Sequence, residues 1–330
     1  MKRGSMSVAV AAGLLAAVLP AIAFGQKSVP VDAQVHLDAA KTLAAKLTAK
    51  LNRPIRACNA SMADRPTLDE RDGPIVKDRM TGTAPLKVFD DVYYVGLPGV
   101  GTYVMKTSEG LVLIDSLYNK GNIQNTLMPS FKTLGLDPKD IKHIFITHGH
   151  GDHDGGAQYL RDTYGAHVYL SDEDYALPRN KNNSPDWGPK PTRDQVLKDG
   201  EVLKVGDRTF TFVKVPGHTP GMMAIIFPVT VDGVPHIAAN WTGGLPNQVK
   251  AAQAFADSVA KFKMVTAKAH ADIAISDHAG SDLKLLADYA KAPPGTKHPL
   301  VIGEENYQDL LSLSGECANA MVSLLKAKVK

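Results

Sequence analysis

The chain has 330 residues, of which 44% are hydrophobic and 22% charged, and its formal net charge is +3. This near balance of charge gives no sign of a nucleic-acid-binding surface and argues against that class of function. The length would allow two small domains. However, strand-like and helix-like patterns alternate throughout and no Ser/Gly-rich linker divides them, so one α/β domain is the expected organisation.

The first 25 residues have the pattern of a secretory signal peptide. Lys2 and Arg3 precede an apolar stretch from Val8 to Leu19, which Pro20 and the small-residue run Ala21-Ile22-Ala23 follow. A membrane anchor is the alternative, but a spanning helix needs about 20 apolar residues and this stretch is shorter. Removal of residues 1–25 takes away two of the 37 basic residues and none of the 34 acidic ones, which leaves a formal charge of +1. We expect a periplasmic or secreted protein with no stable membrane anchor.

Residues 26–85 are expected to form an N-terminal helical extension and arm, ahead of a catalytic domain that spans residues 86–330. Apolar residues recur at every fourth position from Val35 to Leu51, which predicts an amphipathic helix that Pro54 ends. Its apolar stripe, Val35, Ala39, Leu43, Leu47 and Leu51, can pack on its own domain or form an oligomer interface, so the oligomeric state stays open. Residues 59–85, rich in Asp, Arg, Pro and Gly, are predicted to form an irregular arm that crosses toward the active site.

The chain has two cysteines, Cys58 and Cys317. An oxidising compartment allows a disulfide between them without demanding one, and two free buried cysteines are the alternative. Neither cysteine lies at a strand end near the histidine-rich segment described next. We therefore do not expect a thiolate metal ligand.

An apolar β-type run, Ile144-Phe145-Ile146, leads directly into Thr147-His148-Gly149-His150-Gly151-Asp152-His153-Asp154. Residues two apart in an extended segment point the same way, so His148 and His150 are predicted to bind one metal ion. A turn after Gly151 would bring Asp152 and His153 to a second ion, and we attribute the glycines at 149 and 151 to that bend. A solvated, histidine-rich loop is the alternative interpretation, which the density of donors in this segment disfavours.

Two metal ions need more donors, because each ion takes about three protein ligands and keeps a position open for water or substrate. Two histidines further along the chain lie at predicted strand ends. His218 follows a short β-like run between the turn signals Pro216-Gly217 and Pro220-Gly221, and His278 follows the apolar run Ile273-Ala274-Ile275. The predicted ligand sets are His148, His150 and His218 for one ion and Asp152, His153 and His278 for the other. Surface or structural roles are expected for the remaining histidines, His36, His143, His167, His236, His270 and His298.

A long loop from Pro178 to Thr192 carries Trp187 within a run of Asn, Pro, Lys and Gly. Long loops of this kind often serve function, and exposed aromatic residues are enriched at binding sites. Trp187 is therefore a candidate substrate contact, and an anchor for the loop is its alternative role.

The order of these motifs, H-x-H-x-D-H, then G-H-T-P-G, then a last strand-end histidine, resembles the metallo-β-lactamase superfamily over roughly residues 86 to 325. The resemblance implies an α/β fold, the four-layer αβ/βα sandwich, with two zinc ions at the edge between two β-sheets. Leu111-Val112-Leu113-Ile114-Asp115 fits the family's strand that ends in an aspartate. The role it implies for Asp115 is hydrogen-bonded support of the ligand turn and not direct ligation.

The subfamily is indicated by what is missing between His218 and His278. Other branches carry an aspartate or a cysteine there, whereas His236-Ile237-Ala238-Ala239-Asn240-Trp241-Thr242-Gly243-Gly244 has neither. A ligand set of five histidines and one aspartate is similar to the third subclass of class B β-lactamases. In that subclass a serine near the position of Thr242 helps to hold the substrate carboxylate, so Thr242 is a second candidate substrate contact.

The resemblance implies an enzyme that opens the β-lactam ring of antibiotics with metal-bound hydroxide, with Asp152 as a catalytic residue as well as a ligand. The expected partner is thus a small β-lactam and not a nucleic acid. Serine catalysis is not expected, because the weak match Ser281-Asp282-Leu283-Lys284 has no supporting motif. An exported hydrolase of lactones, thioesters or other esters on the same site is one alternative. A non-enzymatic zinc-binding protein is another, although it would need closed four-coordinate sites.

Overall fold

The computed structural model describes residues 29–65, 81–179, 187–280 and 282–329. The predicted signal peptide, most of the predicted arm and the central part of the loop before Trp187 lie outside the described residues. Within the described ranges no helix is both long enough and apolar enough to cross a lipid bilayer.

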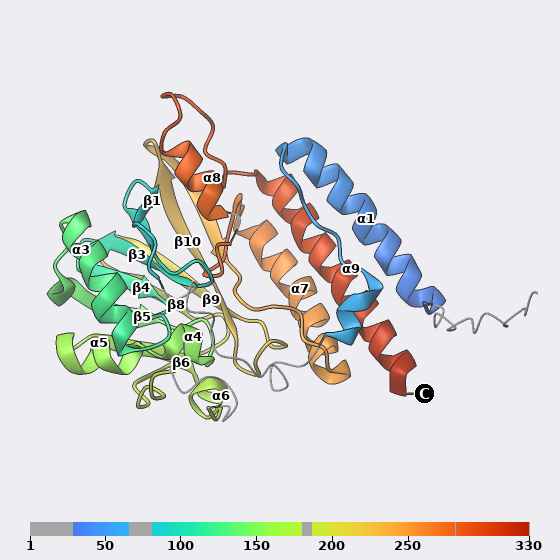
Figure 1. The fold of residues 1–330 in the computed structure, drawn as a ribbon, viewed down its shortest axis with the longest axis horizontal. Coiled ribbons are helices and arrows are strands. Elements are labelled where there is room, and N and C mark those ends of the chain that lie inside the picture. Colours follow the sequence, from blue (N-terminus) through green and yellow to red (C-terminus); the bar gives the residue numbers. More distant parts are fainter. Residues whose placement is uncertain (1–28, 66–80, 180–186, 281, 330) are drawn as a thin grey trace, which may run out of the picture.

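Two mixed β-sheets form the centre of the molecule (Figure 1). The first sheet has seven strands in chain order: β1 (Leu86–Phe89), β2 (Val92–Gly96), β3 (Gly101–Thr107), β4 (Gly110–Ile114), β5 (Ile141–Phe145), β6 (His167–Ser171) and β7 (Gln195–Leu197). Strands β1 to β4 pair antiparallel, and β4 to β7 pair parallel. The parallel half places the carboxyl ends of β4, β5 and β6 along one edge.

The second sheet has five strands in the order β12-β11-β10-β9-β8. These are β8 (Val202–Val205), β9 (Arg208–Lys214), β10 (Met223–Val231), β11 (Val234–Asn240) and β12 (Ile273–Ile275). Strands β8 to β11 form an antiparallel meander, and β12 joins β11 in parallel. Its connections deliver the segment around His218 between β9 and β10, and the segment around His278 after β12.

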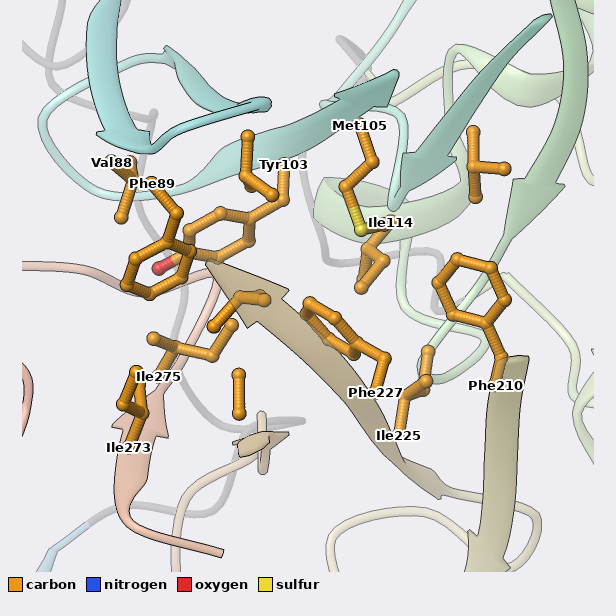
Figure 2. Packing of buried hydrophobic residues seen from close by; sticks show 14 of the residues in the cluster. Val88, Phe89, Tyr103, Met105, Ile114, Phe210, Ile225, Phe227, Ile273 and Ile275 are labelled. Carbon is orange, nitrogen blue, oxygen red and sulfur yellow. The ribbon is translucent and has the colours of Figure 1, made fainter. Parts of the chain in front are cut away.

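The inner faces of the two sheets pack on each other through a continuous apolar core (Figure 2). Alternation along the strands separates this core from two outer layers, since successive side chains in a strand point to opposite faces. In β10, Ile225 and Phe227 lie in the inner core, whereas Ala224 and Ile226 face the outer helices. Tyr103 and Val104 of β3 divide in the same way, which explains why this strand is buried on both faces.

Helices cover both outer faces and complete the predicted four-layer αβ/βα sandwich (Figure 1). On the first sheet the cover is α3 (Met128–Leu134) and α5 (Ala157–Tyr164), and on the second it is α7 (Val249–Lys268) and α9 (Glu304–Val329). Shorter helical segments are η1 (Ala60–Asp64), α2 (Lys120–Asn122), η4 (Ile123–Leu127), η5 (Pro138–Asp140), α4 (Gly151–Asp154), α6 (Asp172–Tyr175) and α8 (Asp282–Tyr289). The fold prediction is therefore confirmed.

The N-terminal helix α1 (Val31–Leu51) begins four residues before the predicted Val35 and lies along α9 (Figure 1). The predicted apolar stripe was wrong at Val35, which is 61% exposed. The buried residues of α1 are Ala33, Leu37, Ala40, Ala44 and Leu47. Their alternating spacing of four and three residues follows the 3.6-residue helical turn, whereas a strict spacing of four drifts around the helix.

Polar contacts and a disulfide fasten the N-terminal extension to α9. Lys46 pairs with Asp309 at 2.7 Å, and Nδ1 of His36 lies 2.6 Å from Glu316. Cys58, just before η1, forms a disulfide with Cys317 of α9. The sequence left this pairing open, and the structure contains it.

Because this disulfide closes a loop across a sequence separation of 259 residues, its loss should destabilise the fold. We expect the Cys58→Ala/Cys317→Ala variant to lose about 2–5 kcal/mol of unfolding free energy, as removal of a native disulfide typically costs. Urea denaturation of the mature protein measures this, with a phosphine reductant added to the wild type as the matched control. An unchanged urea midpoint in both tests would show that helix packing alone holds the extension.

Candidate metal centre

Each predicted metal ligand lies at or just beyond a strand end. His148, His150, Asp152 and His153 occupy the turn after β5 and the first residues of α4, His218 lies between β9 and β10, and His278 follows β12. A hydrogen bond from the Met223 amide to the Thr147 carbonyl, at 2.8 Å, joins the turn after β5 to the start of β10. Two tyrosines of the first sheet, Tyr94 and Tyr103, donate to the carbonyls of Asp277 and Ser276 at 3.2 Å and hold the segment after β12 in place.

The structure brings together His148, His150 and His218, which we call the first group. Nε2 of His148 lies 3.1 Å from Nδ1 of His150. The centroid of the His218 ring is 4.8 Å from that of His148 and 4.7 Å from that of His150. The three rings thus converge from two different loops, as the sequence predicted.

The second group consists of Asp152, His153 and His278. Nε2 of His153 lies 3.1 Å from Nε2 of His278, and Oδ2 of Asp152 lies 3.4 Å and 3.7 Å from these two nitrogens. The two groups are neighbours, because the rings of His148 and His153 have centroids only 4.0 Å apart. Together they present five imidazoles and one carboxylate.

These separations fit zinc-like coordination. Two nitrogens each about 2.0–2.1 Å from a tetrahedral ion lie about 3.3 Å apart, and the closest nitrogen pair in each group is separated by 3.1 Å. Within each group all candidate ligand atoms lie within 4.8 Å of one another. With three donors a group, a fourth position is left for water or substrate.

Hydrogen bonds to the opposite ring nitrogens orient the imidazoles toward the centre. Nδ1 of His218 donates to the carbonyl of Gly244 at 2.9 Å, and Nδ1 of His278 donates to the carbonyl of Gly99 at 2.7 Å. Nδ1 of His148 lies 3.1 Å from the hydroxyl of Thr147. Each contact leaves the Nε2 lone pair free for a metal ion, the arrangement that partners of metal-bound histidines usually impose.

Asp115 directly follows β4, is buried, and supports the turn that carries the ligands His148 to His153. Its carboxylate accepts hydrogen bonds from the amide of Thr147 at 2.8 Å, from the hydroxyl of Thr147 at 2.9 Å and from Nδ1 of His153 at 2.6 Å. The φ of Asp115 is +63°, in the left-handed region that Asp and Asn tolerate better than most residues. The position of Asp115 agrees with the role that the family resemblance implied, hydrogen-bonded support of the ligand turn.

The two groups differ in protonation. Burial lowers the pKa of His150 to about 3 and that of His218 to about 4, and it lowers the pKa of His148 well below its ordinary value. In the second group, burial disfavours charge on His153, but Asp152 and Asp115 outweigh it and raise the pKa of this imidazole. Burial likewise opposes ionisation of Asp152, yet His153 and His278 hold its pKa below the ordinary value. The first group is therefore uncharged at neutral pH, and the second contains an imidazolium beside a carboxylate.

The two candidate substrate contacts fare differently. The structure contradicts the hypothesis for Thr242, because this residue is fully buried and its hydroxyl lies 2.6 Å from the carboxylate of Asp277. The same hydroxyl accepts from the Asp277 amide at 3.1 Å, so it serves the turn before His278. Trp187 is partly buried and packs against the turn of the ligands, since a Cβ on Gly151 would lie 2.3 Å from its indole.

The histidines outside the two groups have structural roles. The six remaining histidines each contact a structural partner: Glu316 for His36, Tyr169 for His143, Asp194 for His167, Asp272 for His236, Glu304 for His270 and the Val88 carbonyl for His298. The segment 147–150 forms the predicted bend, but neither Gly149 nor Gly151 has a positive φ, so close packing is a further reason for glycine at both positions. These positions exclude larger side chains because other residues pack on them.

Sequence reasoning missed two residues that contact the ligand turn, Asp174 and Lys190. Asp174 lies in α6, within the acidic run Asp172-Glu173-Asp174, and accepts from the Gly149 amide at 2.8 Å. Lys190 donates to the Gly149 carbonyl at 2.7 Å. Lys190 lies in the loop Pro178 to Thr192 that the sequence marked as a candidate functional loop, but no spacing rule connects positions 149, 174 and 190, so the pairing itself had no sequence signal.

Known proteins share part of this sequence and its fold. Residues 96–231 match the family described as the Metallo-beta-lactamase superfamily. BJP-1, a subclass B3 metallo-β-lactamase of Bradyrhizobium japonicum, is 24% identical, with a TM-score of 0.59 over 77% of this chain and 95% of that one. A β-lactamase from Chitinophaga pinensis is 21% identical, with a TM-score of 0.62 over 76% of this chain and 98% of that one. At these identities the likeness shows the fold.

Curated sequences match a shorter part of the chain. One is named atrochrysone carboxyl ACP thioesterase AacuM, from Aspergillus aculeatus, and is 28% identical over 130 residues, 39% of this chain and 36% of that protein. Another is the lactamase-like protein nscB of Neosartorya fischeri, 32% identical over 133 residues, 39% of this chain and 34% of that protein. The chain thus spans about a third of the length of these relatives.

The different protonation of the two groups predicts different pH dependence of metal binding. An imidazole with a raised pKa must release its proton when a metal ion binds, so affinity at the second group should fall about tenfold per pH unit on acidification. The first group should bind with nearly constant affinity down to about pH 5.5, because the pKa of His218 is about 4. Zinc titrations of the metal-free protein at pH 7.5 and 5.5, against a competing chelator, measure both affinities. Equal pH slopes at the two groups would contradict this assignment.

Proposed function

We propose that this chain, whose residues 96–231 match the metallo-β-lactamase superfamily, is an exported dizinc hydrolase that opens the β-lactam ring of antibiotics. The observation that carries the proposal is the donor set of two adjacent groups, five imidazoles and one carboxylate. Both cysteines are joined in the disulfide, which removes a thiolate ligand from consideration. The segment 236–244 has no aspartate that could bridge two ions. This combination is the one expected of the third subclass of class B β-lactamases.

Zinc is the metal we propose, since it suits imidazole and carboxylate donors in tetrahedral geometry. When bound, it lowers the pKa of a coordinated water from about 15.7 to about 7 and polarises a carbonyl. The protein supplies the orientation of the donors: the carbonyls of Gly244 and Gly99 and the hydroxyl of Thr147 accept from the Nδ1 atoms. Asp115 fixes His153 in the same manner. No protein nucleophile is required.

Asp152 is the proposed catalytic residue of the chain itself. Its carboxylate stays ionised because His153 and His278 surround it, and its side chain is partly accessible at 19% exposure. A fixed negative charge at this position can accept a hydrogen bond from the attacking water and hold it toward the substrate carbonyl. The neighbouring His278 is 41% exposed.

Export is proposed on two observations. The N-terminal pattern Lys2-Arg3, an apolar run and Ala21-Ile22-Ala23 is that of a cleaved signal peptide. The disulfide between Cys58 and Cys317 supports an oxidising compartment, since structural disulfides are rare in the cytosol. The periplasm or the exterior of the cell is where a β-lactamase would meet its substrate.

A second candidate function is thioester hydrolysis, which the match to a fungal protein named as an acyl carrier protein thioesterase favours. The same centre could act on either substrate, because both reactions place a hydroxide on an acyl carbon. We therefore expect the zinc-loaded mature protein to open a penicillin, a cephalosporin or a carbapenem. A homoserine lactone and a glutathione thioester should be cleaved far more slowly. Rapid cleavage of the thioester or lactone with no β-lactam opened would overturn the β-lactamase assignment.

Single substitutions in the second group test its part in the reaction. We expect His278→Ala and Asp152→Asn each to lower kcat for a chromogenic cephalosporin by about a hundredfold to a thousandfold, the usual cost of removing an electrostatic stabiliser. His270→Ala is the control, because this exposed histidine pairs with Glu304 at 3.0 Å on the surface. Steady-state kinetics with zinc in excess gives the comparison. Near-wild-type rates in both second-group variants would show that this group takes no part in turnover.

A further inference from the structure

Asp174 connects the two loops that supply the first group, although it belongs to neither. It is fully buried in α6, directly after β6. Its Oδ2 accepts from the Gly149 amide at 2.8 Å and from the Thr219 hydroxyl at 2.6 Å, and its Oδ1 accepts from the Gly221 amide at 2.8 Å. Gly149 separates His148 from His150, whereas Thr219 directly follows His218. One carboxylate therefore binds residues of both loops that carry the three imidazoles of the first group.

Lys190 secures the same arrangement from the other direction. Its side chain is 18% exposed, and its ammonium donates to the carbonyls of Gly149 and Asp174, both at 2.7 Å, and to Asp154 at 3.0 Å. Both backbone polar groups of Gly149 are thus occupied, the amide by Asp174 and the carbonyl by Lys190. These two groups belong to the two peptide planes that flank Gly149, so both planes are held, and with them the backbone direction at His148 and His150.

The glycines at 149 and 221 are explained by these contacts. A Cβ at position 149 would lie 2.5 Å from the Lys190 ammonium and 2.6 Å from the Asp174 carbonyl. At position 221 it would lie 2.0 Å from the Ser171 hydroxyl and 2.7 Å from Oδ1 of Asp174. Neither glycine has a positive φ, so backbone conformation does not require them. They leave the room that the carboxylate and the ammonium need.

We propose that Asp174, supported by Lys190, is a positioning residue that fixes the loops of His148, His150 and His218 relative to one another and so sets the metal affinity of the first group. This inference rests on the proposed function in one respect only, that zinc is the ion bound. Asp174 is not one of the six candidate ligands, and it acts through Gly149, Thr219 and Gly221. Residues that orient metal ligands in this way typically contribute about tenfold to a hundredfold in metal affinity.

The test measures zinc binding at one group at a time, because a substitution in the other group weakens metal binding there. In a His278→Ala background, which cripples the second group, we expect Asp174→Asn to weaken zinc binding about tenfold to a hundredfold. An amide of the same size keeps only one acceptor oxygen, so at least one of the three donors loses its partner. In a His218→Ala background, which cripples the first group, Asp174→Asn should leave zinc affinity at the second group unchanged. Chelator competition on the folded, metal-free proteins measures both, with no substrate present.

A milder pair of variants tests the same link should Asp174→Asn fail to fold. Thr219→Val deletes one hydroxyl and keeps the shape of the side chain, so first-group affinity should fall, whereas Thr219→Ser keeps the hydroxyl and should restore it. Asp272→Asn is the matched control. That aspartate also accepts from a backbone amide, Ile237 at 3.1 Å, but it lies before β12, at the opposite end of the strand from His278.

Unchanged first-group affinity in both Asp174→Asn and Thr219→Val would overturn the proposal. So would an equal loss at both groups, or an equal loss in Asp272→Asn, because either would indicate general destabilisation. These outcomes are independent of the substrate. A protein that binds zinc as expected but opens no β-lactam would refute the proposed function and leave the role of Asp174 standing.

Discussion

The buried carboxylate of Asp115 is the interaction on which the rest of the metal centre depends. It lies at the end of β4, and the residue that follows the neighbouring parallel strand by two positions, Thr147, donates to it twice. Nδ1 of His153 completes its contacts at 2.6 Å. A buried charge without partners is expensive, so these three donors and the carboxylate require one another. The result is that the ligand turn cannot shift relative to the sheet without exposing a charge to an apolar core.

The two sheets contribute unequal parts to the site, and their packing brings the parts together. The first sheet supplies four of the six donors from a single turn after β5, while the second supplies His218 and His278 from separate connections. Tyr94 and Tyr103 extend from the first sheet to the segment before His278, and the Met223 amide reaches back from the second sheet to Thr147. The metal centre is thus built at the contact between the sheets, whose packed apolar core Figure 2 shows.

Residues whose contacts are close in the chain could be assigned from the sequence, whereas residues whose partners lie far away in the chain could not. The turn His148 to His153 could be predicted because its donors are close in the chain and follow a strand, so local geometry alone brings them together. His218 and His278 could be predicted because each lies at a strand end with turn residues around it. Thr242 was misassigned, because its hydroxyl pairs with Asp277, thirty-five positions away in the chain. The close packing of Lys190 on Gly149 and of Trp187 on Gly151 could not be predicted, because it depends on residues far away in the chain.

The sequence by itself determined the donors and the absence of a cysteine or an aspartate in the segment 236–244. It did so because these properties depend on residue identity and on spacing of a few positions. Only the tertiary structure decided that Cys58 pairs with Cys317, that α1 packs on α9, and that Asp174 and Lys190 hold Gly149 from two directions. Contacts between distant residues arise from how whole elements pack against each other, and no local pattern in the chain encodes them.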